Sequence, residues 1–97
     1  MLRPKQKAYL KSLAHHLKPV YQIGKDGISD ELIDGILDHL LVHELMKVNI
    51  LNNSMVTFDE ASEAFEAVGI EVVQKIGHIL VLYKASDKAK SPIVIPE

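Results

Sequence analysis

Two apolar runs separated by only two residues constrain the fold more than any other feature of the sequence. Residues 72–76 and 79–83 flank Gly77 and His78, a spacing typical of a β-hairpin with a tight turn. The second run is continuously apolar, which indicates an interior strand covered on both faces of a sheet. The rest of the chain must therefore supply the elements that cover this strand.

Three segments repeat apolar residues at helical spacing. Pro4 suits the first turn of the first helix, which we expect Pro19 to end. Ser29 is a good N-cap for the second helix, and Thr57 with Glu60 forms a capping box that opens the third, which Gly69 closes at the C′ position. In the first helix we expect Leu10, Leu13, Ala14 and Leu17 to face the core. The apolar positions that mark the other two helices are Leu32, Ile33, Ile36, Leu37, Leu40 and Leu41, and then Ala61, Ala64, Phe65 and Val68.

Residues 20–23 and 45–51 are predicted to form two further strands, the second with Met46, Val48 and Ile50 alternating against polar neighbours. Gly35 within the second helix indicates close packing. The element order α-β-α-β-α-β-β predicts an α/β sandwich of two or three layers with a four-stranded mixed sheet. From residue 85 the chain becomes polar, and we expect a frayed tail with a short docking segment at 93–95.

Length and composition exclude several classes of protein. A chain of 97 residues, 47% hydrophobic and 25% charged, should form a single globular domain. The absence of cysteine rules out disulfides and thiolate metal sites. We find no apolar run near the roughly 20 residues that a membrane span needs and no secretory signal. We therefore expect a cytoplasmic protein.

Charge is distributed unevenly although its sum is only −2. Residues 1–25 hold six of the eleven bases and no acid, whereas residues 26–71 hold eleven acids against the single base Lys47. Nucleic acid responds to the local potential, since screening limits its range to about 10 Å. The basic residues Lys7, Lys11, His15 and Lys18 are spaced three or four apart on the first helix, which indicates a cationic stripe or a plain solvated face.

Gly24-Lys25-Asp26-Gly27 lies between a predicted strand and the Ser29-capped helix. Glycines let the backbone approach a phosphodiester, and N–H groups at a helix start can point toward it. Lys25 adds a positive charge, whereas Asp26 opposes a phosphate. We expect this loop and the lysines of the first helix beside it to form one RNA-binding surface. A KH domain sets such a loop between two helices, so the strand before Gly24 disfavours that fold.

Four motifs in order resemble the CRM family, the chloroplast RNA splicing and ribosome maturation domain, and its single-domain YhbY-like members. They are LAHHLKPV at 13–20, QIGKDGIS at 22–29, HELMKV at 43–48, and VVQKIGH at 72–78 with LYK at 82–84. The resemblance implies an RNA-binding domain over 1–84, similar in fold to the C-terminal domain of initiation factor three, followed by the tail at 85–97. It also implies a partner in ribosomal RNA or pre-ribosomal particles during large-subunit assembly.

The predicted RNA-binding residues are Gly24, Lys25, Asp26, Gly27, Lys5, Lys7, Lys11, Lys18 and Lys84. The sequence has His78 and Lys84 where the family commonly has arginine, which predicts weaker phosphate contacts there, because arginine's planar fork suits phosphate better. With few aromatic residues, recognition of backbone shape is expected rather than readout of stacked bases.

Two other classes of function are less consistent with the sequence. An enzyme is not expected, because the nucleophile and nucleotide-binding motifs are missing. His39 and His43 have a possible metal-ligand spacing, but a structural site needs about four ligands, so we expect no metal and no cofactor. The acidic segment could instead make the protein an interaction module for a basic ribosomal or assembly partner. We expect a monomer with neither a membrane nor a small-molecule substrate as partner.

Overall fold

Seven helices and strands follow one another in the predicted order. The computed structural model describes residues 2–90 and 92–95. The elements are α1 (Pro4–Ala14), β1 (Pro19–Ile23), α2 (Asp30–His43), β2 (Leu45–Ile50), α3 (Phe58–Glu66), β3 (Glu71–Ile76) and β4 (Ile79–Tyr83). The predicted α-β-α-β-α-β-β fold is therefore confirmed. None of the described helices is long and apolar enough to cross a membrane.

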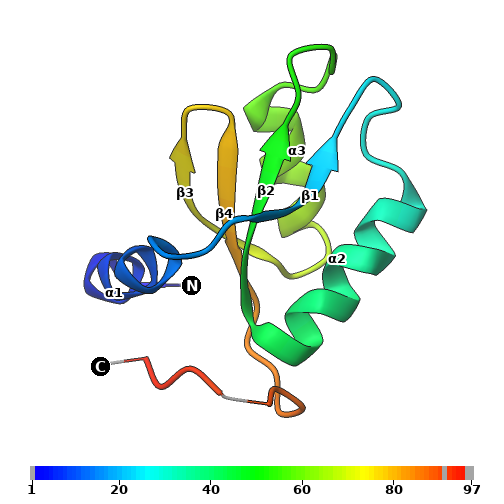
Figure 1. Ribbon diagram of the computed structural model, residues 1–97. Coiled ribbons are helices and arrows are strands. Elements are labelled where there is room, and N and C mark those ends of the chain that lie inside the picture. The colour runs from blue at the N-terminus through cyan, green and yellow to red at the C-terminus, as the bar shows by residue number, and fades with distance from the viewer. Residues whose placement is uncertain (1, 91, 96–97) are drawn as a thin grey trace.

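The four strands form one mixed sheet in the order β1-β2-β4-β3. β1 is parallel to β2, and the other two pairings are antiparallel. The apolar strand β4 is interior, as predicted, and its hairpin turn has Gly77 at a φ of 57°. α1 lies on one face of the sheet and α2 with α3 on the other (Figure 1). The sandwich therefore has three layers.

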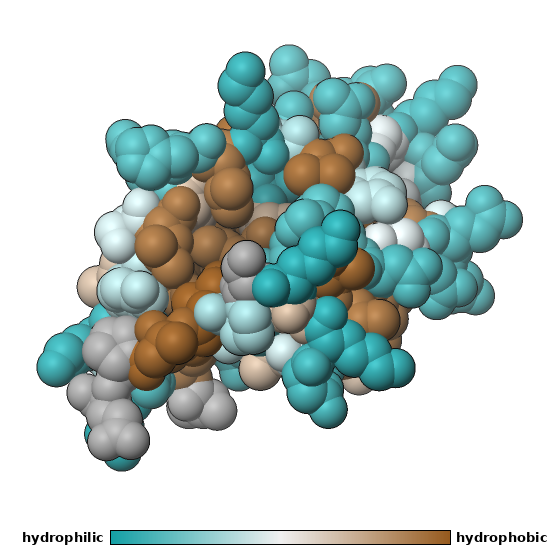
Figure 2. Space-filling model, turned by 60° about the horizontal axis from the view of Figure 1, so that its bottom comes forward, coloured by the Kyte–Doolittle hydropathy of each residue, from teal (hydrophilic) through white to brown (hydrophobic). Residues whose placement is uncertain are grey.

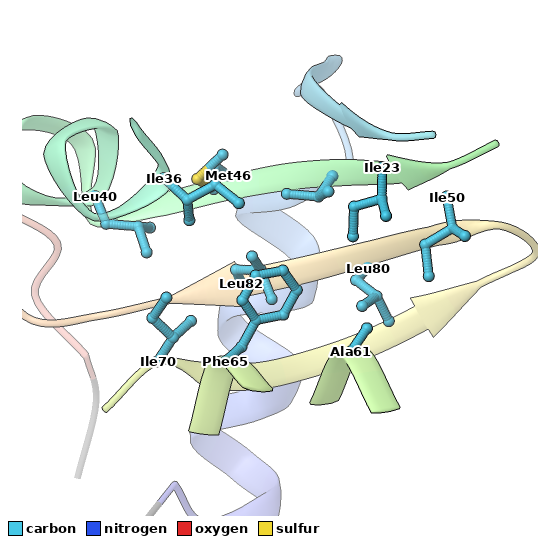
Figure 3. Packing of buried hydrophobic residues seen from close by; sticks show 11 residues of the cluster. Ile23, Ile36, Leu40, Met46, Ile50, Ala61, Phe65, Ile70, Leu80 and Leu82 are labelled. Carbon is cyan, nitrogen blue, oxygen red and sulfur yellow. The ribbon is translucent and has the colours of Figure 1, made fainter. Parts of the chain in front are cut away.

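The larger core fills the space between the sheet and the pair α2 and α3. Ile36 and Leu40 of α2 and Ala61 and Phe65 of α3 are fully buried and point toward the apolar side of the strands (Figure 3). The strands contribute Ile23, Met46, Val48, Ile50, Leu80 and Leu82, and Ile70 adds to them. Burial of large aliphatic and aromatic side chains is the main source of stability in a domain of this size.

Local capping fixes the ends of these two helices. The Ser29 hydroxyl accepts from the Leu32 N–H at 3.1 Å, and Thr57 and Glu60 bond reciprocally at 3.1 and 3.0 Å. Beyond α3, the Gly69 N–H donates to the Glu66 carbonyl and the Ile70 N–H to the Phe65 carbonyl. This is the Schellman pattern with Gly69 at C′, at a φ of 84°. The three predicted caps are confirmed.

Gly35 is the point where α2 approaches the sheet closely. A Cβ atom built there would lie 2.8 Å from the Tyr21 hydroxyl oxygen, closer than Cβ contacts allow. The close packing predicted from this glycine is confirmed, and its cause is the tyrosine ring of β1.

The first helix is shorter than predicted. α1 ends at Ala14, so Leu17 lies in the linker to β1, and Leu13 and Leu17 are 37% and 38% exposed instead of buried. Residues before proline avoid helical backbone, which excludes Lys18. The Lys47 ammonium also donates to the Leu17 carbonyl at 3.0 Å, so this carbonyl is bonded outside any helix.

The predicted frayed tail is wrong for the residues that the structure describes. The Glu44 carboxylate accepts from the N–H groups of Ser86 and Ile93, both at 2.7 Å. Ile93 and Ile95 then pack on the smaller core, formed by Leu10, Ala14, Leu45, Val73, Val81 and Tyr83. The predicted docking segment is confirmed for these two isoleucines, whereas Val94 is 81% exposed. Residues 91, 96 and 97 lie outside the described part of the tail.

Candidate RNA-binding surface

The Gly24–Gly27 loop is a closed turn at the carboxyl end of β1. The Gly27 N–H donates to the Gly24 carbonyl at 3.1 Å, and Gly27 has a φ of 71°. Lys25 and Asp26 are exposed at the tip. The Gly27 N–H is therefore engaged inside the turn, which leaves the tip residues as the parts of the loop that face outward.

The loop packs beside the segment that joins β2 to α3. The Leu51 N–H donates to the Ile23 carbonyl at 2.9 Å, and the Ile50 N–H donates to the His78 carbonyl at 2.8 Å. These bonds bring the loop after β1, the loop after β2 and the β3–β4 turn to one end of the sheet (Figure 1). We call this end the loop end.

Of the predicted stripe, Lys7, Lys11 and His15 recur every four residues along α1 and its C-cap, whereas Lys18 lies beyond the helix. Lys11 and His15 are exposed, and Lys7 is half-buried one turn earlier. Lys5 lies two residues from Lys7 and so faces a different direction. Lys18 is exposed in the linker to β1.

The expectation that these lysines lie beside the glycine loop is wrong. α1 crosses the opposite end of the sheet from the loop end (Figure 1), where its Leu10 and Ala14 pack against Leu45, Val81 and Tyr83. β1 runs from the α1 end to the loop end and keeps the two apart. The α1 lysines and the glycine loop can belong to one surface only if another part of the sheet connects them.

The uncovered half of the sheet lies between α1 and the loop end. Strand alternation turns Ile23, Val48 and Leu80 toward α2 and α3, so the neighbouring side chains face the other way. The residues concerned, which we call the open half-sheet, are Gln22, Asn49, Gln74 and Ile76. This face joins the α1 lysines to the loop end.

Two hollows lie along this face. One of about 450 Å³ is lined by Lys11, Ser12, Ala14, His15, Lys47, Gln74 and Ile76, and we call it the α1–β3 recess. The other, about 260 Å³ at the loop end, is lined by Asn49, Ile50, Leu51, Asn52 and His78. Among the described residues, no Asp or Glu lines either hollow.

Most of the exposed acids lie on the opposite side of the molecule, whereas Asp26 is exposed at the loop tip and Glu71 lies on the α1 side of β3. Eight carboxylates are exposed on α2 and α3, namely Asp30, Glu31, Asp34, Asp38, Asp59, Glu60, Glu63 and Glu66. The backbone and side-chain bonds of Thr57 hold the pKa of Glu60 below its usual value. The segregation of charge along the sequence thus becomes a segregation between the two sides of the sheet.

Lys84, another predicted RNA-binding residue, lies far from the glycine loop. It is half-buried just after β4, at the α1 end of the sheet, and its N–H donates to the Glu44 carbonyl at 2.9 Å. His78, in contrast, is exposed at the loop end and stacks near Phe58 with ring centroids 6.4 Å apart.

His39 and His43 lie together beside an apolar groove. Their ring centroids are 4.4 Å apart, and burial, followed by the neighbouring His43, lowers the pKa of His39. The described residues contain no group of three or more potential metal ligands. The two rings help to line a hollow of about 430 Å³ with Leu13, Leu17, Lys18, Val20, Leu45, Met46 and Ile93, and apolar side chains gather on this end of the molecule (Figure 2).

This geometry defines a small three-layer domain with an acidic helical side and a partly open sheet side, whose two hollows are lined by no acid among the described residues. Residues 2–84 match the CRS1 / YhbY (CRM) domain family, and the chain belongs to this family.

Several known proteins are similar to this chain over nearly their whole length and over nearly all of this chain. The Bacillus subtilis protein named "Probable RNA-binding protein YqeI" is 42% identical over 91 residues, which cover 93% of this chain and 95% of that protein. A Haemophilus influenzae protein named "RNA-binding protein" is 41% identical over 90 residues, or 92% and 91% of the two chains. The solution structure of the hypothetical protein SAV1595 from Staphylococcus aureus has a TM-score of 0.75 at 42% identity and covers 99% of this chain and 100% of that one.

Three residues of this surface were not predicted from the sequence. Lys47 is almost fully buried beneath the linker, and its signal was its isolation as the single base within residues 26–71. Gln74 and Ile76 face the open half-sheet because of an irregularity in β3, which no pattern in the sequence indicated.

Proposed function

We propose that this protein binds RNA through the side of the sheet that carries α1. The observation that supports this proposal most is the spatial separation of charge. Eight exposed carboxylates lie on α2 and α3, whereas no acid of the described residues lines the two hollows on the α1 side. This side has Lys11 and His15 at one end and Lys25, with Asp26 beside it, at the other. Such a surface attracts a phosphate backbone even though the net charge is −2. The names of the relatives from B. subtilis and H. influenzae describe RNA-binding proteins, which agrees with RNA as the ligand.

We further propose ribosomal RNA of the large-subunit precursor as the target, bound in the cytoplasm by a monomeric protein without a catalytic step. This follows the resemblance to the CRM family. Recognition should rest mainly on backbone shape, because Phe65 and Tyr83 are buried and offer no stacking platform.

Crosslinking in cells, followed by sequencing of the bound RNA, tests the target. Recovery of large-subunit ribosomal RNA enriched over other abundant RNAs supports the proposal. Recovery of protein partners without RNA would favour the acidic face as an interaction surface and would overturn it.

The glycine loop can be tested separately from the fold. A Cβ at Gly24 would lie 3.7 Å from Leu51, an ordinary contact, so Gly24→Ala should fold normally. Lys25→Ala removes the exposed charge beside it. If the loop contacts the backbone of RNA, both variants should bind more weakly; unchanged affinity in both would remove the loop from the binding surface.

A further inference from the structure

We propose that the α1–β3 recess receives one unpaired nucleotide of the bound RNA. The inference rests on the proposed function and adds to it the part of the RNA that this surface selects. Its phosphate would lie toward Lys11 and His15, and its base would lie against Ile76 within reach of the Gln74 amide.

The walls of the recess come from two elements that are distant in sequence. Lys11, Ser12 and His15 come from the last turn and C-cap of α1, and Gln74 and Ile76 come from β3. Its volume of about 450 Å³ lies within the range of small-ligand sites. Lys47 also lines it, but its ammonium is already bonded to the Leu17 carbonyl, so Lys11 and His15 are the side chains of this wall that can contact a phosphate.

An irregularity in β3 turns these β3 side chains toward the recess. The pairing with β4 shifts between Val72 and Gln74, so that Gln74 lies opposite Val81 and Ile76 opposite Ile79. Val81 belongs to the core on the α1 side, which places Gln74 on that same side. Bulges of this kind re-aim side chains near functional sites.

The same shift turns Lys75 to the opposite side. Its partner in β4 is Leu80, a residue of the α2–α3 core, and the Lys75 ammonium lies 3.9 Å above the centre of the Phe58 ring. The strand therefore places an amide and an apolar side chain on the open face and sends its lysine away from that face. A surface that served phosphate attraction alone would gain from the reverse arrangement.

Within an interface that otherwise follows the shape of the RNA backbone, the chemistry of the recess suits a single base. Ile76 is 47% exposed, so its apolar surface is free to contact the flat face of a base. The Gln74 side chain both donates and accepts hydrogen bonds and can match a base edge. An RNA duplex keeps its bases paired and presents phosphates, so it can reach Lys11 and His15 but cannot put a base into the recess.

Two RNAs of equal length and charge test this inference: a hairpin with one bulged nucleotide and a fully paired hairpin. The double variant Gln74→Ala/Ile76→Ala should bind the bulged RNA about tenfold more weakly and the paired RNA within twofold of wild type. The matched control is Lys75→Ala, on the other face of the same strand, which should not distinguish the two RNAs.

A second variant tests the same contact by an expected increase in affinity. Ile76→Phe replaces an exposed aliphatic side chain with a ring that stacks better on a base, so it should bind the bulged RNA several-fold more tightly and the paired RNA as wild type does. Equal effects on both RNAs, or none on the bulged RNA in either variant, would overturn the inference and leave the proposed function in place. Wild-type protein that binds neither RNA would overturn the proposed function itself.

Discussion

The two faces of the sheet are made by the same four strands, yet they differ in cover and in charge. α2 and α3 cover one face completely and bury a core of eleven described residues, including Phe65. α1 covers only half of the other face, over a core of six, including Leu10. The solvent-exposed sides of the covering helices α2 and α3 carry eight acids. Within the part of the chain that the structure describes, no acid lines the two hollows on the half-open face.

Under the proposed function, this difference assigns stability to one face and RNA binding to the other within a chain of 97 residues. A helix that covers only part of a sheet leaves backbone-ordered side chains on a rigid surface. Rigid elements hold recognition groups in place better than loops do. Substitutions on the covered face should therefore change the free energy of unfolding, whereas substitutions on the half-open face should change RNA affinity.

The largest effect on stability should come from Phe65→Ala. The ring is fully buried between α3 and the sheet, and truncation of a buried Phe costs about 3–5 kcal/mol. Urea denaturation measures the loss, with Tyr9→Ala, at a residue 37% exposed, as the control. A loss below about 1 kcal/mol would show that the covered face is not the main source of stability.

Glu44→Gln should have the next largest effect and should act on the C-terminal segment. An amide offers one oxygen in place of two, so either Ser86 or Ile93 loses the acceptor for its N–H. The loss should be about 1–3 kcal/mol, because the bonds are to a charged group. Hydrogen exchange at the Ser86 and Ile93 amides reports it directly. Unchanged protection at both amides would show that the Glu44 carboxylate does not hold the C-terminal segment. Glu63→Gln on the surface of α3 is the matched control.

Gly35→Ala should lower the free energy of unfolding, although the same substitution in an ordinary helix interior raises it. Alanine is favoured over glycine by up to about 1 kcal/mol in a helix interior, but the added Cβ would lie 2.8 Å from the Tyr21 hydroxyl. We expect a net loss of about 1 kcal/mol or less, reduced when Tyr21→Phe is also present. If Gly35→Ala alone instead raised the free energy of unfolding by the full helix preference of alanine, the Tyr21 ring would have to move away at no cost.

The smallest effect should be a pH dependence from His39. Burial, and then His43, lower its pKa below the ordinary value of 6.5, so the unfolded chain binds the proton more readily. The contribution of neutral His39 to the free energy of unfolding is therefore fully present above about pH 6.5 and declines as the pH falls through the lowered pKa. His39→Gln should make the urea midpoint depend less on pH between about pH 5 and pH 7, and His43→Gln should have a smaller effect of the same kind. A stronger pH dependence in His39→Gln would contradict the lowered pKa of His39.

Much of this fold could be predicted from the sequence because its signals are local. The caps at Ser29, Thr57 and Gly69 involve residues within a few positions of each other, and the interior strand 79–83 was evident from its own composition. The family resemblance, carried by short motifs, is confirmed by the match over residues 2–84.

What could not be predicted depends on contacts between distant residues. The length of α1 is tied to a bond between Lys47 and Leu17, thirty residues apart, and the ordered tail depends on Glu44, which reaches Ser86 and Ile93. The surface joining α1 to the glycine loop depends on the pairing of β3 with β4. The contribution of each predicted site residue to RNA binding stays a prediction.

The salt dependence of RNA affinity in two matched triple variants tests the central claim most directly. Lys7→Ala/Lys11→Ala/Lys18→Ala removes three charges from α1 and its linker, and Lys75→Ala/Lys88→Ala/Lys90→Ala removes three exposed charges elsewhere. If the half-open face binds RNA, the first variant should bind more weakly, with a slope of log affinity against log salt reduced by about 2–3. The second should keep a nearly wild-type slope. Equal reductions in both variants would contradict a binding surface on the α1 side of the sheet.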